Sequence, residues 1–126
     1  MTRTGVLGGT FDPPHLGHLV LAAAAREVLG LDRVLFVPAG NPWRKADREV
    51  TPAAARLDLV RAAVAPYAWA EVSTIEVDRD GPSYAAETME ALVADGGAWW
   101  FILGSDALAD LPHWHEPQRL LAAARL

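Results

Sequence analysis

Cysteine is absent from this sequence of 126 residues, and its absence excludes disulfide bonds, thiolate catalysis and zinc sites built on cysteine. Basic side chains are outnumbered by acidic ones, 11 against 16, which gives a formal net charge of −5. A general nucleic-acid or anionic-membrane surface is therefore not expected, and an anionic ligand would have to be bound locally. The sequence also contains no apolar run of membrane-spanning length and no long apolar stretch of a signal peptide. We expect a soluble protein of the cytoplasm.

A single domain is the simplest organisation for a chain of this length, in which 52% of the residues are hydrophobic. No internal repeat, low-complexity segment or linker-like boundary divides residues 1–126. Short apolar runs predict buried strands, and longer segments with helical spacing of apolar residues predict helices. The expected strands are residues 4–7, 33–38, 70–72 and 98–103, and the expected helices are residues 19–29 with a start near 16, 52–64 capped by Thr51, 84–93 capped by Ser83, and about 117–126.

Residues 8–18 join the first expected strand to the first expected helix, and their composition suits the close approach of an anion. Gly8 and Gly9 place no Cβ in the way of a phosphate, and the helix N-terminus offers unpaired N–H groups. His15 and His18 are three residues apart, so both can point to one side of the first helical turn and donate to one oxyanion. The plain structural alternative is a glycine turn followed by histidines that only cap the helix. The combination of features favours a phosphate site.

The same stretch, GGTFDPPHLGH, resembles the GxFxPxHxGH signature of the nucleotidyltransferases that carry an HxGH tetrad, here residues 15–18. Its wording is similar in particular to that of the bacterial nicotinate-nucleotide adenylyltransferases. The resemblance implies that His15 and His18 are catalytic residues that hold the triphosphate of ATP, and that Thr10 contacts a phosphate oxygen. The ATP-binding residues that it implies are Gly8, Gly9, Thr10, Phe11, His15, His18, Gly104 and Asp106.

Residues 39–50 contain the densest basic cluster of this acidic chain. Most such clusters are solvated loops, but this one follows the carboxyl end of a strand, where open α/β sheets bind ligands. We favour ligand contact for Lys45 and also for Arg44. In the family a basic residue closes a proline-rich loop here, usually as PPHK or PPHR, whereas this chain reads PWRK. The resemblance implies that Lys45 is catalytic, acting on developing negative charge, and that it contacts the mononucleotide substrate.

Residues 81–88, GPSYAAET, resemble the GxSYTxDT segment of the family, which lines the pyridine-nucleotide pocket. Ala85 and Glu87 replace the threonine and aspartate of that pattern. The resemblance implies that Ser83, Tyr84 and Thr88 bind nicotinate mononucleotide, and backbone N–H groups at this helix start could hold its carboxylate. A purely structural role for Ser83, as the helix N-cap, is the alternative.

The fourth expected strand ends in Gly104, Ser105 and Asp106, and Asp106 could simply cap the next helix. The wording FILGSDAL is similar to the FILGSDxL segment of the family, which implies that Gly104 and Asp106 face the ribose and phosphates of the nucleotide. In the family the tryptophan that follows a proline shortly downstream stacks on the pyridine ring. Trp114, two residues after Pro112, holds that position.

These segments would meet at the carboxyl end of an α/β, Rossmann-like doubly wound parallel sheet. The resemblance implies adenylyl transfer from ATP to nicotinate mononucleotide, which gives nicotinate adenine dinucleotide and pyrophosphate in NAD biosynthesis. The phosphate of the substrate would attack the α-phosphorus of ATP, so catalysis would consist of positioning and charge stabilisation. Mg²⁺ would be bound through the ATP phosphates and not by protein side chains. No nucleic-acid or membrane partner is expected.

Three alternatives stay open. Pantetheine-phosphate adenylyltransferase shares the HxGH tetrad, although the SYxxET and PHWHEP stretches favour a pyridine nucleotide. A nucleotide-binding module without turnover is the second alternative. The third is a zinc site formed by His15, His18, His113 and His115. Two points argue against it: four histidines are not the usual ligand set of a structural zinc site, and the glycines before His15 would have no role in such a site.

The family enzymes continue to an ISSTxIR motif at a further helix N-terminus, whereas this sequence ends at Leu126. The resemblance therefore implies a chain without the last strand and the C-terminal helices of the family, as a fragment or a short form. In the family the fourth strand lies between the first and the fifth, so we expect residues 98–103 to form an unpaired apolar edge, which recruits other chains. We expect weak or no turnover from the isolated chain and a tendency to form a homo-oligomer.

Overall fold

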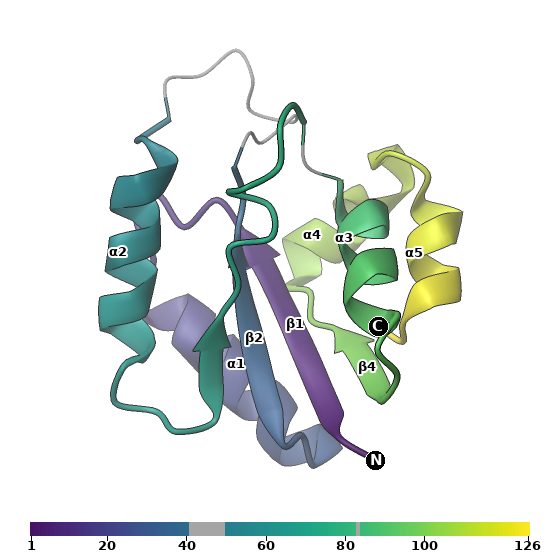
Figure 1. Ribbon diagram of the computed structural model, residues 1–126. Coiled ribbons are helices and arrows are strands. Elements are labelled where there is room, and N and C mark those ends of the chain that lie inside the picture. The colour runs from purple at the N-terminus through teal and green to yellow at the C-terminus, as the bar shows by residue number, and fades with distance from the viewer. Residues whose placement is uncertain (41–49, 83) are drawn as a thin grey trace.

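The computed structural model describes residues 1–40, 50–82 and 84–126, and it confirms the expected α/β architecture (Figure 1). The strands are β1 (Arg3–Gly9), β2 (Arg33–Pro38), β3 (Ala70–Val72) and β4 (Ala98–Phe101). The helices are α1 (Leu16–Leu29), α2 (Ala53–Val64), α3 (Ala85–Val93), α4 (Ser105–Asp110) and α5 (Pro117–Ala123), with a short 3₁₀ helix, η2 (Leu111–His113), before α5. In the described part of the chain, no helix has the length and apolar character needed to cross a membrane.

The strands form one parallel sheet in the order β3-β2-β1-β4. Parallel neighbours need crossover connections, and helices α1, α2 and α3 provide them between successive strands. Along the chain, β2 and β3 are added successively on one side of β1, and β4 is then added on the other side of β1. In open α/β sheets, ligands bind outside the carboxyl ends of the strands at such a reversal. The predicted doubly wound sheet is therefore confirmed, and its reversal lies at β1.

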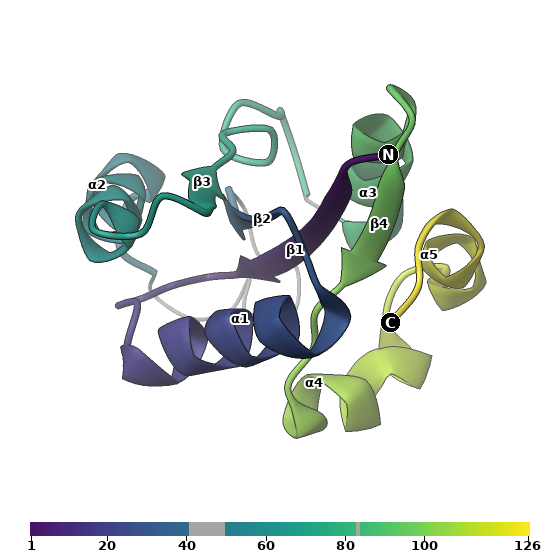
Figure 2. The same cartoon turned by 90° about the horizontal axis from the view of Figure 1, so that it is seen from below.

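Helices cover both faces of the sheet (Figure 2). Along β2, Val34 and Phe36 join the core that packs against α1 and α2, whereas Leu35 and Val37 join the core that packs against α3 and α5. A strand that is buried on both faces has an uninterrupted apolar sequence, as these four residues show. Strand β2 is therefore packed from both faces along its length.

Helix α2 begins one residue later than predicted, and it buries a residue that was predicted to lie on its outer side. Thr51 is not its N-cap; Pro52 holds that position and makes no side-chain cap bond. The backbone of Thr51 has other partners, because its N–H donates to Asp12 Oδ2 at 2.9 Å and its carbonyl accepts from Arg56 Nε at 2.7 Å. The prediction that Arg56 lies on the outer side of α2 is also wrong, since Arg56 is only 1% exposed. Backbone carbonyls from outside the helix surround its guanidinium and make this burial tolerable.

Two boundaries near the predicted site also differ from the sequence prediction. Helix α3 starts one residue late, because Tyr84 is an extended N-cap residue without a side-chain cap bond. Strand β4 ends at Phe101, two residues early. Beyond it the Ile102 N–H still donates to the Val6 carbonyl at 2.8 Å, so the chain leaves the ladder gradually.

Strand β4 lies at the edge of the sheet, as predicted, but its outer side is not wholly unpaired. The Phe101 N–H donates to the Arg125 carbonyl at 2.6 Å, and the Arg125 N–H donates to the Trp99 carbonyl at 3.2 Å. The helix predicted for residues 117–126 ends early, because Ala124 is extended with φ −151° and ψ 160°. The expectation of an unpaired edge is therefore wrong where Arg125, beyond the end of this helix, pairs with β4.

Candidate functional site

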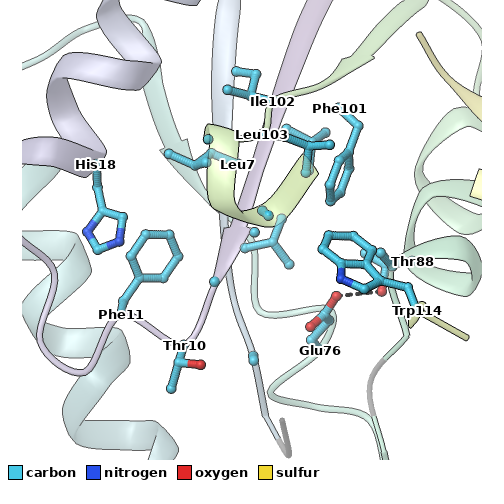
Figure 3. Close-up of a pocket in the computed structure, with 18 of the residues that line it drawn as sticks. Leu7, Thr10, Phe11, His18, Glu76, Thr88, Phe101, Ile102, Leu103 and Trp114 are labelled. Atoms are coloured by element: carbon cyan, nitrogen blue, oxygen red, sulfur yellow. Dashed lines mark hydrogen bonds between the residues drawn. The ribbon is translucent and has the colours of Figure 1, made fainter. Parts of the chain in front are cut away.

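The carboxyl ends of β1, β2 and β4 open onto one cavity of about 960 Å³, shown in Figure 3. The residues predicted for the site that line this cavity are Gly8, Gly9, Thr10, Phe11, His15, His18, Tyr84, Thr88, Gly104, Asp106 and Trp114. They come from the β1–α1 turn, the start of α3, the β4–α4 turn and the segment after η2. Lys45, Arg44 and Ser83, which the sequence also predicts, lie outside the described residues.

The β1–α1 turn fixes both histidines in a reciprocal cap. His15 is the N-cap of α1, and its Nδ1 accepts the N–H of Gly17 at 3.1 Å. His18 Nδ1 accepts the N–H of His15 at 3.0 Å. Because both Nδ1 atoms accept, the proton of each neutral ring sits on Nε2. The structural alternative is correct in that the histidines cap the helix, but capping leaves each Nε2–H able to donate to a ligand.

Steric crowding explains why the third residue of the tetrad, Gly17, is a glycine. A Cβ on Gly17 would lie 2.8 Å from Cε1 and 2.9 Å from Nδ1 of His15, so a larger residue would displace the capping ring. The rings of His15 and His18 stack with centroids 3.8 Å apart, and the buried ring of Phe11 meets His18 edge-on at 4.7 Å. Packing and hydrogen bonding together fix the orientation of the His18 ring.

Burial lowers the pKa of His18, and positive charge on His15 lowers it further. A lowered pKa keeps His18 neutral near pH 7, as its accepting Nδ1 requires. Protonation would place a second donor opposite the N–H of His15 and break the cap. His18 is therefore suited to donate a hydrogen bond and unsuited to act as a general base, because its accepting nitrogen is already occupied.

Sequence reasoning missed Arg56, whose guanidinium lies behind the β1–α1 turn. Its Nε donates to the Thr51 carbonyl at 2.7 Å, and its Nη1 donates to the carbonyls of Thr10 at 2.9 Å and Ala39. Its Nη2 donates to the Gly40 carbonyl at 3.3 Å. Burial lowers the pKa of Arg56, although a nearby carboxylate raises it in part. The only sequence signal was a basic residue next to the apolar positions of α2.

Glu76 is a second residue that sequence reasoning missed. It is half-buried and lines the cavity, where Figure 3 shows it beside Thr88 and below the ring of Trp114. The Thr88 hydroxyl donates to Glu76 Oε2 at 2.7 Å and accepts from Arg79 Nη1 at 3.0 Å. Burial raises the pKa of Glu76, while the bond from Thr88 and the charge of Arg79 lower it in part. Because the Thr88 hydroxyl is occupied, Glu76 presents the polar group at this wall.

Trp114 lies on the side of the cavity opposite His18 (Figure 3). Its Nε1 donates to Asp110 Oδ2 at 3.2 Å, and its ring meets Phe101 edge-on at 6.0 Å between centroids. The next residue, His115, stacks on Tyr84 with centroids 4.0 Å apart, and so joins the segment after η2 to the start of α3. These contacts hold an aromatic face in a fixed position, as recognition of a planar ring requires.

Gly104 and Asp106 lie at the entry to α4. Gly104 is the N-cap of this helix, so the alternative in which Asp106 caps it is wrong; Asp106 lies in the first turn and lines the cavity. Asp12, Glu76 and Asp110 also line the cavity, whereas no described lysine or arginine does. Within residues 1–40, 50–82 and 84–126, no three histidine, cysteine or acidic side chains are placed to hold a metal ion. The four-histidine zinc site is therefore not formed.

Comparison with known proteins gives a family match over nearly the whole chain. The cytidylyltransferase-like family model matches residues 6–126. A curated relative from Dehalococcoides mccartyi, named "Probable nicotinate-nucleotide adenylyltransferase", is 42% identical over 127 residues, or 98% of this chain and 62% of the relative. A relative of the same name from Roseiflexus sp. is 49% identical over 123 residues, or 97% of this chain and 62% of the relative. The chain thus spans about 62% of the length of these relatives.

A solved structure supports the fold. The Plasmodium falciparum nicotinic acid mononucleotide adenylyltransferase complexed with NaAD has a TM-score of 0.76 to this chain at 17% identity. The match covers 95% of this chain and 60% of that one. At this identity the likeness shows the shared arrangement of strands and helices.

Proposed function

The chain belongs to the cytidylyltransferase-like family, and from this premise we propose that it serves adenylyl transfer from ATP to nicotinate mononucleotide, with nicotinate adenine dinucleotide and pyrophosphate as products. Curated relatives named for this activity match nearly all of the chain. The observation that carries the proposal is the reciprocal cap of His15 and His18. It orients two Nε2–H donors beside the N-terminus of α1, where an anion is favoured.

The reaction needs no nucleophile from the protein. An oxygen of the mononucleotide phosphate bonds to the α-phosphorus of ATP, the bond from that phosphorus to the bridging oxygen breaks, and pyrophosphate leaves with the electron pair. The protein contributes position and charge stabilisation. His15 and His18 would hold the triphosphate through Nε2–H, and Thr10 would contact a phosphate oxygen. Lys45, outside the described residues, would stabilise the charge that develops on the phosphates.

Carboxylates line the described part of the cavity and no described lysine or arginine does, so positive charge for the triphosphate would come from outside the described residues. Mg²⁺ carried by the ATP phosphates would supply that charge. Gly104 and Asp106 would face the ribose and phosphates of ATP.

Nicotinate mononucleotide would bind at the opposite wall, with its ring against Trp114. Its carboxylate would lie near the start of α3, at Ser83 and Tyr84, because a helix N-terminus favours an anion. Thr88 would act through Glu76, which its hydroxyl holds, and not by direct contact.

Calorimetry tests the two halves of the proposal separately. The chain should bind Mg·ATP, and it should bind nicotinate mononucleotide more tightly than nicotinamide mononucleotide. Trp114→Ala should weaken mononucleotide binding about tenfold by removing the stacking face, and it should leave ATP affinity unchanged. Equal affinities for the two mononucleotides, or no effect of Trp114→Ala, would contradict this assignment. ATP binding without product on incubation with both substrates would favour the binding module without turnover.

A further inference from the structure

Arg56 is a buried cation that is not among the residues lining the cavity, yet it contacts the backbone of three segments beside the cavity. It is 1% exposed. Its guanidinium donates to carbonyls in three segments that are far apart in sequence: Thr10 after β1, Ala39 and Gly40 after β2, and Thr51 before α2. The turn that contains Thr10 continues to the capping histidines of α1.

Only arginine can make this set of contacts. Its planar guanidinium has five N–H donors in fixed directions, so one group can bond several carbonyls that converge from different sides. Lysine has a single compact ammonium on a flexible stem and cannot reproduce that geometry. The carbonyl of Ala39 in turn needs a donor, because this residue is buried and a buried backbone oxygen outside a ladder is costly when left unpaired.

Independent contacts join the same three segments. The Ala39 N–H donates to the Gly9 carbonyl at 2.8 Å, and the Thr51 N–H donates to Asp12 Oδ2 at 2.9 Å. Gly40 packs so closely on the segment of Glu76 that an added Cβ would lie 2.3 Å from the Glu76 carbonyl oxygen. The network around Arg56 therefore extends from the β1–α1 turn to the wall that carries Glu76.

We propose that Arg56 is a positioning residue of this site: its guanidinium holds the three backbone segments in the arrangement that binds the phosphates of a nucleotide. It touches neither substrate, and it acts through the carbonyls of Thr10, Ala39, Gly40 and Thr51. The identity of the ligand rests on the proposed function, whereas the order that Arg56 imposes on the segments does not.

Arg56→Lys tests the proposal, with Val60→Ala as the matched control. Val60 lies one helical turn further along α2, is equally buried, and belongs to the core that includes Val34 and Phe36 of β2. In Arg56→Lys, amide exchange should accelerate at Ala39 and Thr51 and stay slow at Val34 in the sheet. Its affinity for Mg·ATP should fall by about tenfold or more through misplacement of the donors. Val60→Ala should lower the melting temperature without changing that affinity.

Wild-type protein provides a second arm if the lysine variant does not fold. Binding and loop order are linked reciprocally, so Mg·ATP should slow hydrogen exchange at Arg56 Nε–H. Exchange at Arg3 Nε–H, which donates to the Gly30 carbonyl at 3.2 Å, should not change. Unchanged exchange at Ala39 and Thr51 in the variant, equal loss of affinity in Val60→Ala, or an unaffected Arg56 Nε–H would overturn the proposal. If the wild type does not bind Mg·ATP, the proposed function fails and the amide exchange alone decides the role of Arg56.

Discussion

The imidazole of His18 has one nitrogen atom that caps the helix and one that remains available to a ligand. Its Nδ1 accepts the His15 N–H and completes a capping box, while its Nε2–H remains for an anion. A single alanine substitution would therefore mix loss of helix stability with loss of binding. A side chain that keeps the acceptor and removes the imidazole donor separates the two effects.

His18→Gln is that substitution, because glutamine at this helix position accepts from the N-cap N–H in capping boxes. We expect its melting temperature to stay near that of the wild type, and adenylyl transfer to fall roughly a hundredfold through loss of an oriented donor. His18→Ala should lose the same activity and also about 1 kcal/mol of folding stability. Thermal denaturation and a turnover assay measure both quantities. Full turnover in both variants would remove His18 from the site.

The buried carboxylate of Glu76 should lower the free energy of unfolding near neutral pH. Because burial raises its pKa in the folded state, the folded chain keeps the Glu76 proton to a higher pH than the unfolded chain does. The stability that this group contributes is full below the ordinary glutamate pKa of about 4.3 and is lost as pH rises through the raised value.

Glu76→Gln can still accept from the Thr88 hydroxyl and carries no charge. Its melting temperature should therefore exceed that of the wild type at pH 8, and the difference should vanish near pH 4. Asp80→Asn, which changes an exposed carboxylate in the same segment, is the matched control and should show no such dependence. Denaturation curves at the two pH values decide. A Glu76→Gln variant no more stable than wild type at pH 8 would contradict the cost of burying this charge.

Sequence alone could place His15 and His18 together at the start of α1, because their partners are local, within three residues. Their role in binding stays a prediction. Arg56 and Glu76 were missed for the opposite reason. The Thr10 carbonyl that Arg56 bonds is 46 residues away, and the Thr88 hydroxyl that Glu76 accepts from is 12 residues away. A charged residue is expected at the surface unless its distant partners are known.

Helix α1 illustrates how function can oppose local helix preference. Alanine is a better helix former than glycine by about 1 kcal/mol within a helix. Gly17 nevertheless occupies the first turn, because a Cβ there would meet the ring of His15. Steric room for the capping imidazole, and not backbone flexibility, explains this glycine.

Gly17→Ala should therefore weaken the site even though it favours the helix. We expect the affinity for Mg·ATP to fall by about tenfold or more, because the displaced His15 ring no longer directs its donor. Val28→Ala, at a position 82% exposed near the end of α1, is the control: it also favours the helix and should leave the affinity unchanged. Calorimetry compares the variants. Wild-type affinity in Gly17→Ala would show that the His15 ring can move without consequence.

Local sequence patterns predicted most of the helices and strands correctly. The predictions were wrong where contacts between distant segments determine the structure. The end of α1 was confirmed, because Gly30 adopts the left-handed conformation, with φ 63° and ψ 46°, that closes a helix. The outer face assigned to Arg56 in α2 was wrong, because the carbonyls that satisfy it belong to other segments. The predicted extension of α5 was wrong as well, since Arg125 runs beside β4 instead. Neither contact can be recognised from the residues that are its neighbours in sequence.

The sheet as a unit explains why the predicted segments converge. Parallel order places the carboxyl ends of β1, β2 and β4 at one edge, and the reversal at β1 opens the cavity between them. Arg125 occupies part of the outer side of β4. Formation of a homo-oligomer through the rest of that edge stays a prediction, which sizing chromatography of the chain can check.

The most direct measurement is an amide chemical-shift titration of the isotopically labelled chain with Mg·ATP. If the nucleotide binds where its donors converge, the largest shifts should fall on Gly9, Thr10, Gly17 and His18, with further shifts at Asp106. The amides of α2 that face away from the cavity, such as that of Asp58, should not move. Saturable shifts confined to the β1–α1 and β4–α4 turns are the expected result. No saturable shifts, or shifts confined to other parts of the chain, would contradict a nucleotide site at the reversal of this sheet.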